Sequence, residues 1–519
     1  MMLRISINQR YNALTMPFGI LAICLAFATV PTQASEPQAP DASIRALPAV
    51  EETITADPIV FDSYLSNNDP QPSTTDRLDI LEAGYSDLQT NYDALSEDYD
   101  DLKKKMKLSV TPGHDQTKTK LTGRLHADHW AIPNSSPAIN IFESGDPTIS
   151  PQDRFGFRRI RFGVQGDLWH TMLYKIEMEF AGGNKFEFRD NYLGWKEVPV
   201  LQTLLVGNQK RPYGLDHLNS SRYNVFLERP FVIEAINQDA RRLGIAAYGV
   251  SEDEAWNWRY GVYNQRLIQD EGFYISDHYQ PELAGRLANT FWYDEASDGR
   301  GYGHLAVSGT IANPDENGGT EGRATNEARF RHRGEARSRS RWIDTGIIEG
   351  ATTYGMLGLE NVWNFGPVQM VGEYQNLWLG RSSDPDVHFY GAYGYISYFL
   401  TGEHMTWSRS KGTLGRVKPL ENFFLVDTCN DGVRGGWGAW QIAYRYSYGD
   451  FTDDNIYGGV GKTHTLGLNW YWNAYARMQF NAIYGEIDDH RDINDDGEQV
   501  GPVLSGNFAV LGTRFMVDF

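Results

Sequence analysis

Beyond Thr117, apolar and polar side chains alternate with a period of two residues until the chain ends, a pattern that indicates β-strands. Within 159–168, Ile160, Phe162 and Val164 share one face, and Arg159 and Arg161 share the other. A row of charged side chains cannot face lipid, and a soluble β-sandwich, the alternative fold, would not pack arginines into its core. The alternation therefore predicts a closed barrel that is apolar outside and polar inside.

The alternating segments number about sixteen, an even count, which a closed antiparallel barrel with both termini on one side requires. Mean hydropathy is −0.48, and after residue 30 no apolar run approaches the roughly 18 to 20 residues of a membrane-spanning helix. The predicted fold class is all-β, a transmembrane antiparallel β-barrel of about 16 strands. The strands are expected to begin near Lys120, Phe155, Met172, Lys185, Thr203, Arg241, Trp256, Glu282, Gly301, Ala351, Pro367, Val387, Gly436, Lys462, Tyr475 and Asn507.

The chain ends in Phe519, with Phe515 and Val517 on the same face. A terminal aromatic residue that closes an alternating strand resembles the signal read by outer-membrane assembly machinery. If this strand runs down into the periplasm, the long segments 210–239, 312–349 and 486–505 lie outside the cell, and the turns at 364–367 and 473–474 lie in the periplasm. The long segment 401–435 then falls on the periplasmic side, so either it folds into the lumen or the strand count is wrong.

The N-terminal part has three predicted regions. Residues 1–34 form a signal peptide, with Arg4 and Arg10 before an apolar stretch and a small-residue cleavage site. Residues 35–75 are a disordered linker in the periplasm. Cys24 makes a poor lipidation site, which leaves Cys429 alone in the mature chain and permits no internal disulfide.

Residues 76–108 carry apolar side chains at spacings of three and four over four heptads. This periodicity predicts a coiled coil, with a single amphipathic helix as the alternative. A coiled coil needs partner chains, and three would match a homotrimer. The coil positions are Leu78, Leu81, Tyr85, Leu88, Tyr92, Leu95, Tyr99, Leu102 and Met106.

The formal net charge of −20 argues against nucleic acid as a partner. No nucleophile, base and orienting residue lie at an informative spacing, so the sequence indicates no enzyme and no cofactor. Asp492, Asn494, Asp496 and Gly497 match the first half of a calcium loop, but its twelfth position is Val503 instead of Glu. A solvated acidic loop is the alternative, and no metal ligand is assigned.

Several motifs beyond Thr117 resemble the phosphate- and pyrophosphate-selective porins of the porin O and P family. They are "SSRYNVFLERP" at 220–230, "RRLGI" from Arg241, "YFLTGE" at 398–403 and "RVKP" at 416–419, with the C-terminal aromatic residue. The resemblance implies that the third and fifth extracellular loops and one periplasmic connection narrow the barrel; here these are 210–239, 312–349 and 401–435. Phosphate-selective members place lysines at the constriction, whereas the fifth loop here carries seven arginines and no lysine.

The candidate pore residues are cationic, because a charged lining sets ion selectivity in a narrow channel and guanidinium binds phosphate or carboxylate. The alternatives are pairing with inward-facing glutamates on neighbouring strands and, for the fifth loop, contact with lipopolysaccharide phosphates. Alternation points Arg124, Arg159, Arg161, Arg445, Arg477 and Arg514 inward; Lys210 and Arg222 lie in the third loop, and Arg329, Arg331 and Arg333 in the fifth.

These observations predict an outer-membrane porin through which small, phosphate-like anions diffuse passively. Its expected partners are outer-membrane lipids and two further copies of the chain in a homotrimer, with the coiled coil in the periplasm. The alternative function is a structural tether that links the barrel to the cell wall or to a periplasmic partner through the coiled coil.

Overall fold

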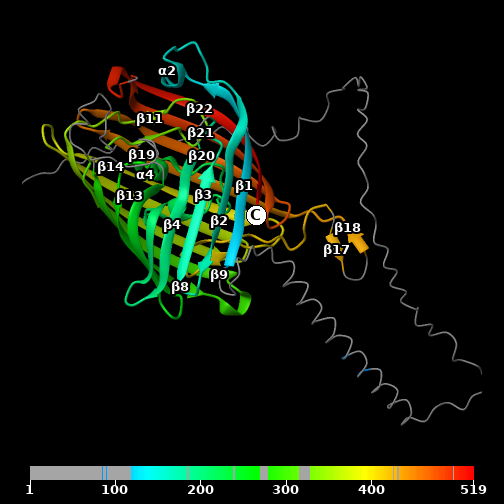
Figure 1. Cartoon of the computed structure of the whole chain (residues 1–519). Coiled ribbons are helices and arrows are strands. Elements are labelled where there is room, and N and C mark those ends of the chain that lie inside the picture. Colours follow the sequence, from blue (N-terminus) through cyan, green and yellow to red (C-terminus); the bar gives the residue numbers. More distant parts are fainter. Residues whose placement is uncertain are drawn as a thin grey trace, which may run out of the picture. The chain divides into compact units, whose positions relative to one another are not determined.

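The computed structural model contains a β-barrel built from the C-terminal four-fifths of the chain (Figure 1). The predicted signal peptide, linker and coiled coil lie outside the described residues, apart from Tyr85 and Gln89 within the coil. Among the described residues, no helix is long and apolar enough to cross a membrane. The described ranges are 118–183, 186–237, 240–268, 279–314, 328–424, 426–428, 432–494 and 496–519.

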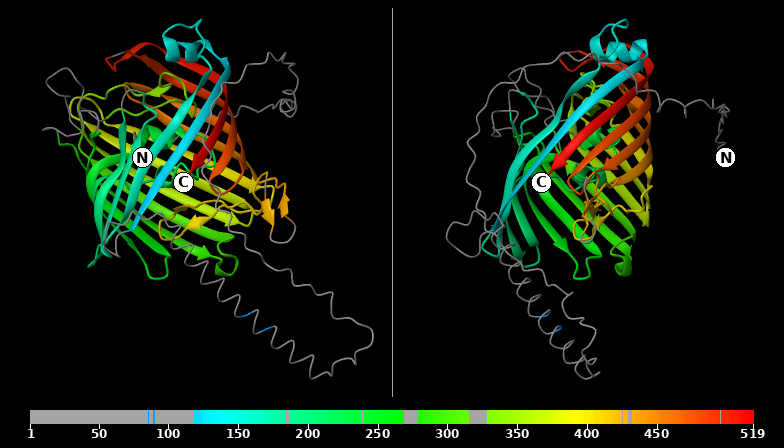
Figure 2. Two further views of the ribbon diagram at one scale, coloured as in Figure 1. Left: turned by 45° about the vertical axis from the view of Figure 1, so that its right-hand side comes forward. Right: turned by 90° about the vertical axis from the view of Figure 1, so that its right-hand side faces the viewer.

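Sixteen antiparallel strands close the barrel, and β1 pairs with β22 to complete it (Figures 1 and 2). The predicted fold class and strand number are confirmed. The wall strands are β1 (Lys118–Ser135), β2 (Arg154–Leu168), β3 (Met172–Glu179), β4 (Glu187–Val198), β5 (Gln202–Lys210), β6 (Arg241–Val250), β7 (Trp256–Asn264), β8 (Pro281–Tyr293), β9 (Gly301–Ala312), β12 (Ala351–Phe365), β13 (Val368–Arg381), β14 (Val387–Phe399), β19 (Ala439–Asp453), β20 (Ile456–Tyr471), β21 (Ala476–Ile493) and β22 (Gln499–Asp518).

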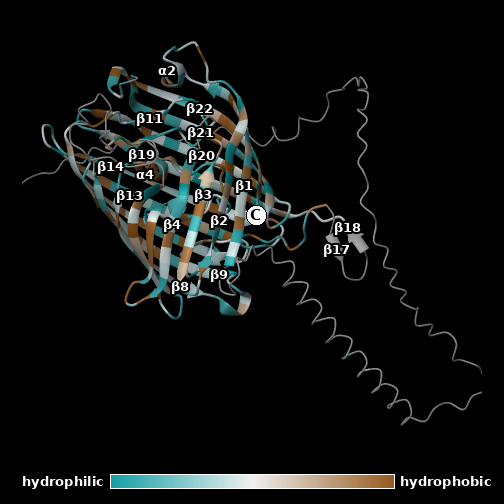
Figure 3. Cartoon of the chain, viewed as in Figure 1, coloured by the Kyte–Doolittle hydropathy of each residue, from teal (hydrophilic) through white to brown (hydrophobic). Residues whose placement is uncertain are grey.

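The two faces of the wall differ as the alternation predicts, and apolar and polar colours alternate along the strands in Figure 3. Outward side chains such as Phe162, Leu305 and Leu466 are at least half exposed. Inward neighbours such as Gln441 and Thr465 are fully buried. An outer surface of exposed apolar side chains is stable only against hydrocarbon, so the barrel has the surface of a membrane protein.

Apart from 400–438, every connection at one end of the barrel has seven residues or fewer, whereas the other end carries the long connections 136–153, 211–240, 265–280 and 313–350 besides several short turns. The turns 169–171, 366–367 and 472–475 mark the short end, which in such barrels faces the periplasm. The exception there is 400–438, of which residues 404–417, here called the lumen segment, contact the inner wall. The segment 486–505, which the sequence predicts to lie outside the cell, consists of the ends of β21 and β22 and a turn at 494–498.

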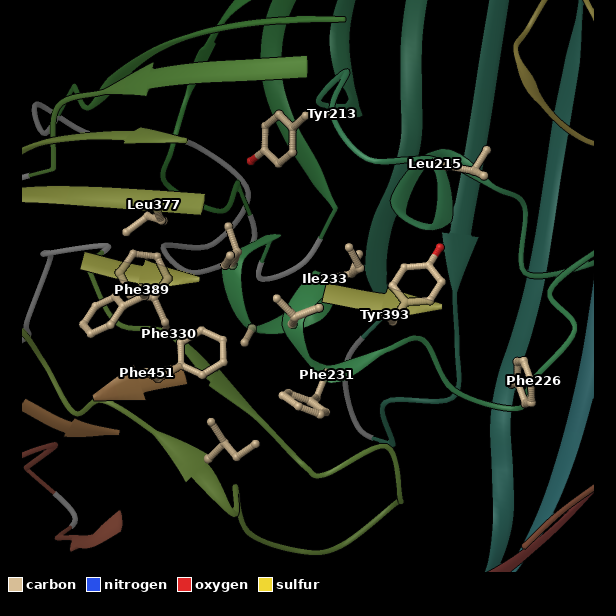
Figure 4. Packing of buried hydrophobic residues seen from close by; sticks show 14 of the residues in the cluster. Tyr213, Leu215, Phe226, Phe231, Ile233, Phe330, Leu377, Phe389, Tyr393 and Phe451 are labelled. Atoms are coloured by element: carbon tan, nitrogen blue, oxygen red, sulfur yellow. The ribbon is translucent and has the colours of Figure 1, made fainter. Parts of the chain in front are cut away.

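Two extracellular connections fill part of the lumen. Loop 3 (211–240) contains α3 (Leu215–Leu218) and α4 (Phe231–Asn237), and loop 5 (313–350) contains β10 (Arg331–His332) and β11 (Ile343–Asp344). Figure 4 shows Phe231 and Ile233 of loop 3 near Phe330 of loop 5 and near Phe389 and Phe451 of the wall. Loop 3 is therefore fixed to the wall by a compact apolar cluster.

Glycines in the wall permit this close packing. A Cβ at Gly449 or Gly461 would lie 2.7 to 3.1 Å from the ring of Phe231, and one at Gly391 would lie 2.5 Å from Val232. The distances of 2.5 and 2.7 Å are shorter than carbon atoms tolerate, and the distance of 3.1 Å would require the Phe231 ring to shift. The three glycines on β14, β19 and β20 thus form the groove that receives α4. This packing leaves open space on the opposite side of the lumen, along β1 to β7.

Candidate pore lining

Several of the predicted pore arginines hold loop 3 against the wall. Arg514 of β22 forms a bidentate pair with Asp128 of β1, at 2.6 Å to each oxygen. It also contacts Glu228 of loop 3 at 2.7 Å. From the other side, Arg158 binds the same Glu228 at 2.7 and 2.9 Å. Glu228 thus joins loop 3 to two wall strands, and the surrounding guanidinium groups lower its pKa well below the usual range despite its burial.

Arg445 and Arg477 act in the same way. The Arg445 guanidinium lies 2.6 Å from the Glu335 carboxylate of loop 5 and donates to the backbone carbonyl of Glu228. Arg477 donates to the carbonyl of Asn224 at 2.7 Å. Both side chains are buried. The structure therefore places Arg445, Arg477 and Arg514 at the contact between wall and loop, where their donors are already largely used.

The predicted loop-5 arginines are divided between structural and open positions. Arg329 forms a bidentate pair with Asp344, at 2.8 and 2.7 Å, and Arg331 lies opposite Asp344 in the β10–β11 ladder. Arg333 donates to the carbonyl of Ser338 at 2.9 Å. Arg333 is partly exposed and, within the described part of the chain, has no carboxylate partner.

Arg337 and Arg341 lie near Arg333 in loop 5 and likewise lack an ion pair among the described residues. Burial and the charge of Arg341 lower the pKa of Arg333, and burial and Arg331 lower the pKa of Arg341. The charge of Arg158, followed by burial, lowers the pKa of Arg337. The mutual repulsion of these groups would be relieved by an anion.

The other five predicted residues line one cavity of about 870 Å³ on the open side of the lumen, here called the chamber. The wall strands β1 to β7, loop 3 and the lumen segment enclose it. Among the described residues that line it, twelve side chains are cationic and one, Asp190, is a carboxylate. The cations are Lys120, Arg124, Arg159, Arg161, Lys175, Lys210, Arg222, Arg229, Arg241, Arg259, Lys411 and Arg416.

Carboxylates behind the lining neutralise only part of this charge. Seven of the cations pair with five carboxylates, those of Glu177, Glu179, Asp190, Glu234 and Asp518. The other five have no carboxylate partner within the described ranges: Lys120, Arg159, Lys210, Arg259 and Lys411. The chamber thus keeps an excess of seven positive charges, because twelve cations face five carboxylates.

Individual cations of the chamber differ in how available they are. Lys210 donates to the carbonyls of His217, Leu218 and Asn219 at 2.8 to 2.9 Å, so it ends the α3 turn and has no proton left for a ligand. Arg222 donates to the carbonyl of Gly123 and pairs with Asp518. Lys411 lies on the lumen segment, where burial and then the charge of Arg259 lower its pKa.

Sequence reasoning missed Arg158 and seven of the twelve chamber cations, which are Lys120, Lys175, Arg229, Arg241, Arg259, Lys411 and Arg416. Lys120 and Arg259 follow the same alternation as their predicted neighbours and could have been found from it. Arg158 could not, because a register shift between His126 and Ala127 leaves it unpaired, so that it joins Arg159 on the inner side. Lys411 belongs to the lumen segment, whose path inside the barrel no alternation records.

The calcium-like residues lie at the end of β21 and in the turn that follows it, where Asn494 accepts from the backbone N–H of Glu498 at 2.8 Å. Within the described ranges, no group of three or more His, Cys, Asp or Glu side chains is placed to hold a metal ion. These contacts explain Asn494 as a turn residue.

The family model described as "Phosphate-selective porin O and P" matches residues 141–519. An uncharacterized protein of Caulobacter vibrioides is 27% identical over 377 residues, which cover 70% of this chain and 68% of that protein. Porin O of Pseudomonas aeruginosa is 28% identical over 155 residues, 28% of this chain and 32% of Porin O. The chain thus aligns with about a third of Porin O.

Among solved structures, the outer membrane channel DcaP of Acinetobacter baumannii is similar, with a TM-score of 0.47 and 11% sequence identity. The similarity covers 79% of this chain and all of DcaP.

Proposed function

The chain belongs to the phosphate-selective porin O and P family, and from this premise we propose that small anions, phosphate among them, diffuse passively through its cationic chamber. It is a channel of the outer membrane and not an enzyme. The observation that carries the proposal is the excess of positive charge in the chamber, where five of twelve cations have no carboxylate partner among the described residues.

Electrostatics favours anions in such a space. A unit charge at 4 Å from an ion contributes about 1 kcal/mol in bulk water and about 4 kcal/mol at the effective dielectric near a protein surface. Several uncompensated cations surround the chamber, so a cation would have to cross a region of unfavourable potential. Loop 3 and the lumen segment meet where the Leu414 N–H donates to Asn219 Oδ1 at 3.0 Å. This contact restricts the path of an ion to the side of the lumen that holds the chamber.

The loop-5 arginines would supply a second region of positive charge on the extracellular side. Arg333, Arg337 and Arg341 are partly exposed and are not neutralised within the described residues. An anion could therefore be attracted at the outer opening and then pass to the chamber. We further propose that the functional unit is a homotrimer in contact with outer-membrane lipids.

The test is the reversal potential of single channels in planar bilayers under a tenfold KCl gradient. The wild-type chain should give a potential of the sign for chloride preference. Neutralising three chamber cations in Lys120→Gln/Arg159→Gln/Lys411→Gln should move it toward zero. A matched triple variant, Lys118→Gln/Lys196→Gln/Lys462→Gln, removes three lysines that do not line the chamber and should keep the wild-type value.

A cation-selective or unselective wild-type channel would disprove the proposal, as would an equal shift in both triple variants. Phosphate is tested by adding it to chloride solutions of constant ionic strength. If phosphate binds in the chamber, chloride conductance falls, and it falls less in the chamber variant. A chloride conductance that phosphate leaves unchanged would remove phosphate from the proposal while leaving chloride selectivity intact.

A further inference from the structure

The periplasmic connection 400–438 has two parts with different surroundings. The lumen segment is bound inside the barrel: the Trp407 indole donates to Thr290 Oγ1 at 3.0 Å, and Arg286 donates to the carbonyl of Gly412 at 2.9 Å. Beyond it, the Leu420 N–H donates to Glu403 at the rim. The chain then leaves the lumen and forms the hairpin of β17 (Val426–Thr428) and β18 (Gly432–Arg434), which lies outside the wall in Figures 1 and 2.

The base of this hairpin is attached to the outer, lipid-facing side of the rim. The Phe423 N–H donates to the carbonyl of Trp472 at 2.7 Å, and its ring packs on Trp470 with a centroid distance of 4.5 Å. The carbonyl of Trp437 accepts from the indoles of Trp440 and Trp470, at 3.2 and 2.8 Å. These contacts fix the position of the hairpin base, in which the Phe423 ring packs on the wall while other apolar side chains stay exposed.

Three large apolar side chains of this base are exposed: Leu420 by 72%, Phe424 by 65% and Trp437 by 77%. We call them the rim strip. The strip is continuous with the lipid-facing surface, because its backbone contacts Trp440 and Trp470. These lie near the start of β19 and the end of β20, two strands whose outer faces carry exposed Ile442 and Leu466. Tryptophan at such a border is typical of the membrane interface, where one side of the ring meets hydrocarbon and the other meets water.

We propose that the rim strip inserts into the inner, phospholipid leaflet of the outer membrane and thereby anchors the lumen segment. A lipid surface suits the strip better than a second copy of the chain, because β19 to β22, beside which it lies, are among the longest strands, with 15 to 20 residues. About 9 to 11 tilted residues cross a bilayer, so this side of the barrel spans the membrane fully. The shortest strands, β3, β5 and β7, are on the other side, with 8 or 9 residues.

The anchor has a consequence for the pore. The rim strip and the lumen segment belong to one covalent connection, and only residues 418 and 419 separate Val417 from Leu420. Lipid contact outside the barrel therefore limits the movement of the segment that carries Lys411 and meets loop 3 inside it. Loss of the strip should make the constriction less steady while the barrel itself stays folded.

The direct test places a nitroxide label at Phe424→Cys, in a chain with Cys24→Ser and Cys429→Ser, reconstituted in vesicles of phosphatidylethanolamine and phosphatidylglycerol. Labels at Leu466→Cys, on the lipid face, and Glu498→Cys, in the exposed extracellular turn, are the controls. The label at 424 should have the high oxygen accessibility of position 466 and a several-fold lower accessibility to a water-soluble nickel complex than position 498. Leu420→Cys serves if the first variant does not fold.

Nickel accessibility equal to that at position 498 would place the strip in water. Shielding from both reagents would place it against protein, a second copy of the chain included. Either result overturns the proposal.

The second measurement is the closing frequency of single channels. Leu420→Ser/Phe424→Ser/Trp437→Ser should close several-fold more often than wild type, whereas Val200→Ser, which alters an exposed apolar residue in another periplasmic turn, should not. Equal closing in all three proteins would remove the link to the pore.

Discussion

Glu335 of loop 5 joins three parts of the barrel, and its replacement by Gln gives a direct measure of how the loops are held. One carboxylate oxygen lies 2.6 Å from Arg445 of the wall and accepts from Thr465 at 3.3 Å. The other accepts from the Phe231 N–H of loop 3 at 3.1 Å. The charged side chains of the Arg445–Glu335 pair are almost completely buried, at 2% and 0% exposure.

The magnitude follows from this burial. Removing one partner of a buried ion pair costs about 3 to 5 kcal/mol, because the remaining charge is left uncompensated. Gln can keep the bond to either Phe231 or Arg445 but not both, since its second atom is a donor. The remaining carbonyl of Glu228 and the ring of Phe226 at 4.5 Å still stabilise Arg445, which places the cost near 3 kcal/mol. That corresponds to a roughly hundredfold change in an opening equilibrium.

Hydrogen exchange of the Phe231 amide measures this opening directly. In Glu335→Gln the amide should exchange about a hundred times faster than in wild type, with wall amides of β14 and β20 unchanged. The matched control is Glu187→Gln, which breaks the pair with Arg189 in which the carboxylate is 37% exposed, and for which less than about 1 kcal/mol is expected. Adding Arg445→Met to Glu335→Gln should restore much of the protection. Wild-type exchange at Phe231 in Glu335→Gln would refute the assignment of Glu335 as the element that couples the two loops.

Three further predictions concern the pore. The Glu143 carboxylate accepts from the backbone N–H groups of Arg339 and Ser340 and from the Trp342 indole, at 2.8 to 3.0 Å. Glu143→Gln should therefore speed hydrogen exchange of the Arg339 and Ser340 amides by about tenfold or more. The control, Asp146→Asn, alters only local bonds to Thr148 and should leave this exchange unchanged. Anion preference should decrease between 0.1 M and 1 M KCl, because the Debye length falls from about 10 Å to about 3 Å. The measurement is the reversal potential at a fixed concentration ratio, and a potential that stays constant as both concentrations rise would contradict the prediction. Burial, followed by the charge of Arg259, lowers the pKa of Lys411, so its charge is lost at a lower pH than that of an ordinary lysine. Reversal potentials measured as pH is raised should therefore show anion preference falling earlier in wild type than in Lys411→Arg.

The starts of the strands were predicted well where one face of the wall meets lipid and the other meets the polar lumen. β6, β7, β9, β12 and β14 begin at the predicted residues, because apolar side chains face lipid and polar ones face the lumen along their whole length. β20 and β22 begin at Ile456 and Gln499, six and eight residues before the predicted starts. Their first residues pair with the distal part of β21, where Asp488 and Asp489 occur. Outside the membrane the outer face need not be apolar, so the strand continues without its sequence pattern.

The candidate site was predicted as a set of inward-facing cations, but alternation does not report what each cation meets. The partners of Arg445 and Arg514 include Glu335 and Glu228, more than 100 residues away in the chain and on loops without periodicity. The position of Arg158 depends on a bulge, which a strict period of two cannot contain. Side-chain direction could therefore be derived from the sequence, whereas the division between loop-holding and chamber-lining arginines depends on long-range contacts.

Burial explains how one kind of side chain serves both purposes in this lumen. An arginine enclosed by two or more acceptors, such as Arg514, has its donors directed at fixed protein groups and stabilises the loops. An arginine at the chamber surface, such as Arg259, donates to one carbonyl and otherwise lies over the Tyr248 ring, so its charge stays uncompensated by any carboxylate of the described chain. The net charge of −20 does not oppose this, because charges beyond about 8 Å are screened at physiological ionic strength. Under the proposed function, local pairing in the chamber decides the selectivity of the pore, while paired arginines such as Arg445 and Arg514 hold loop 3 against the wall.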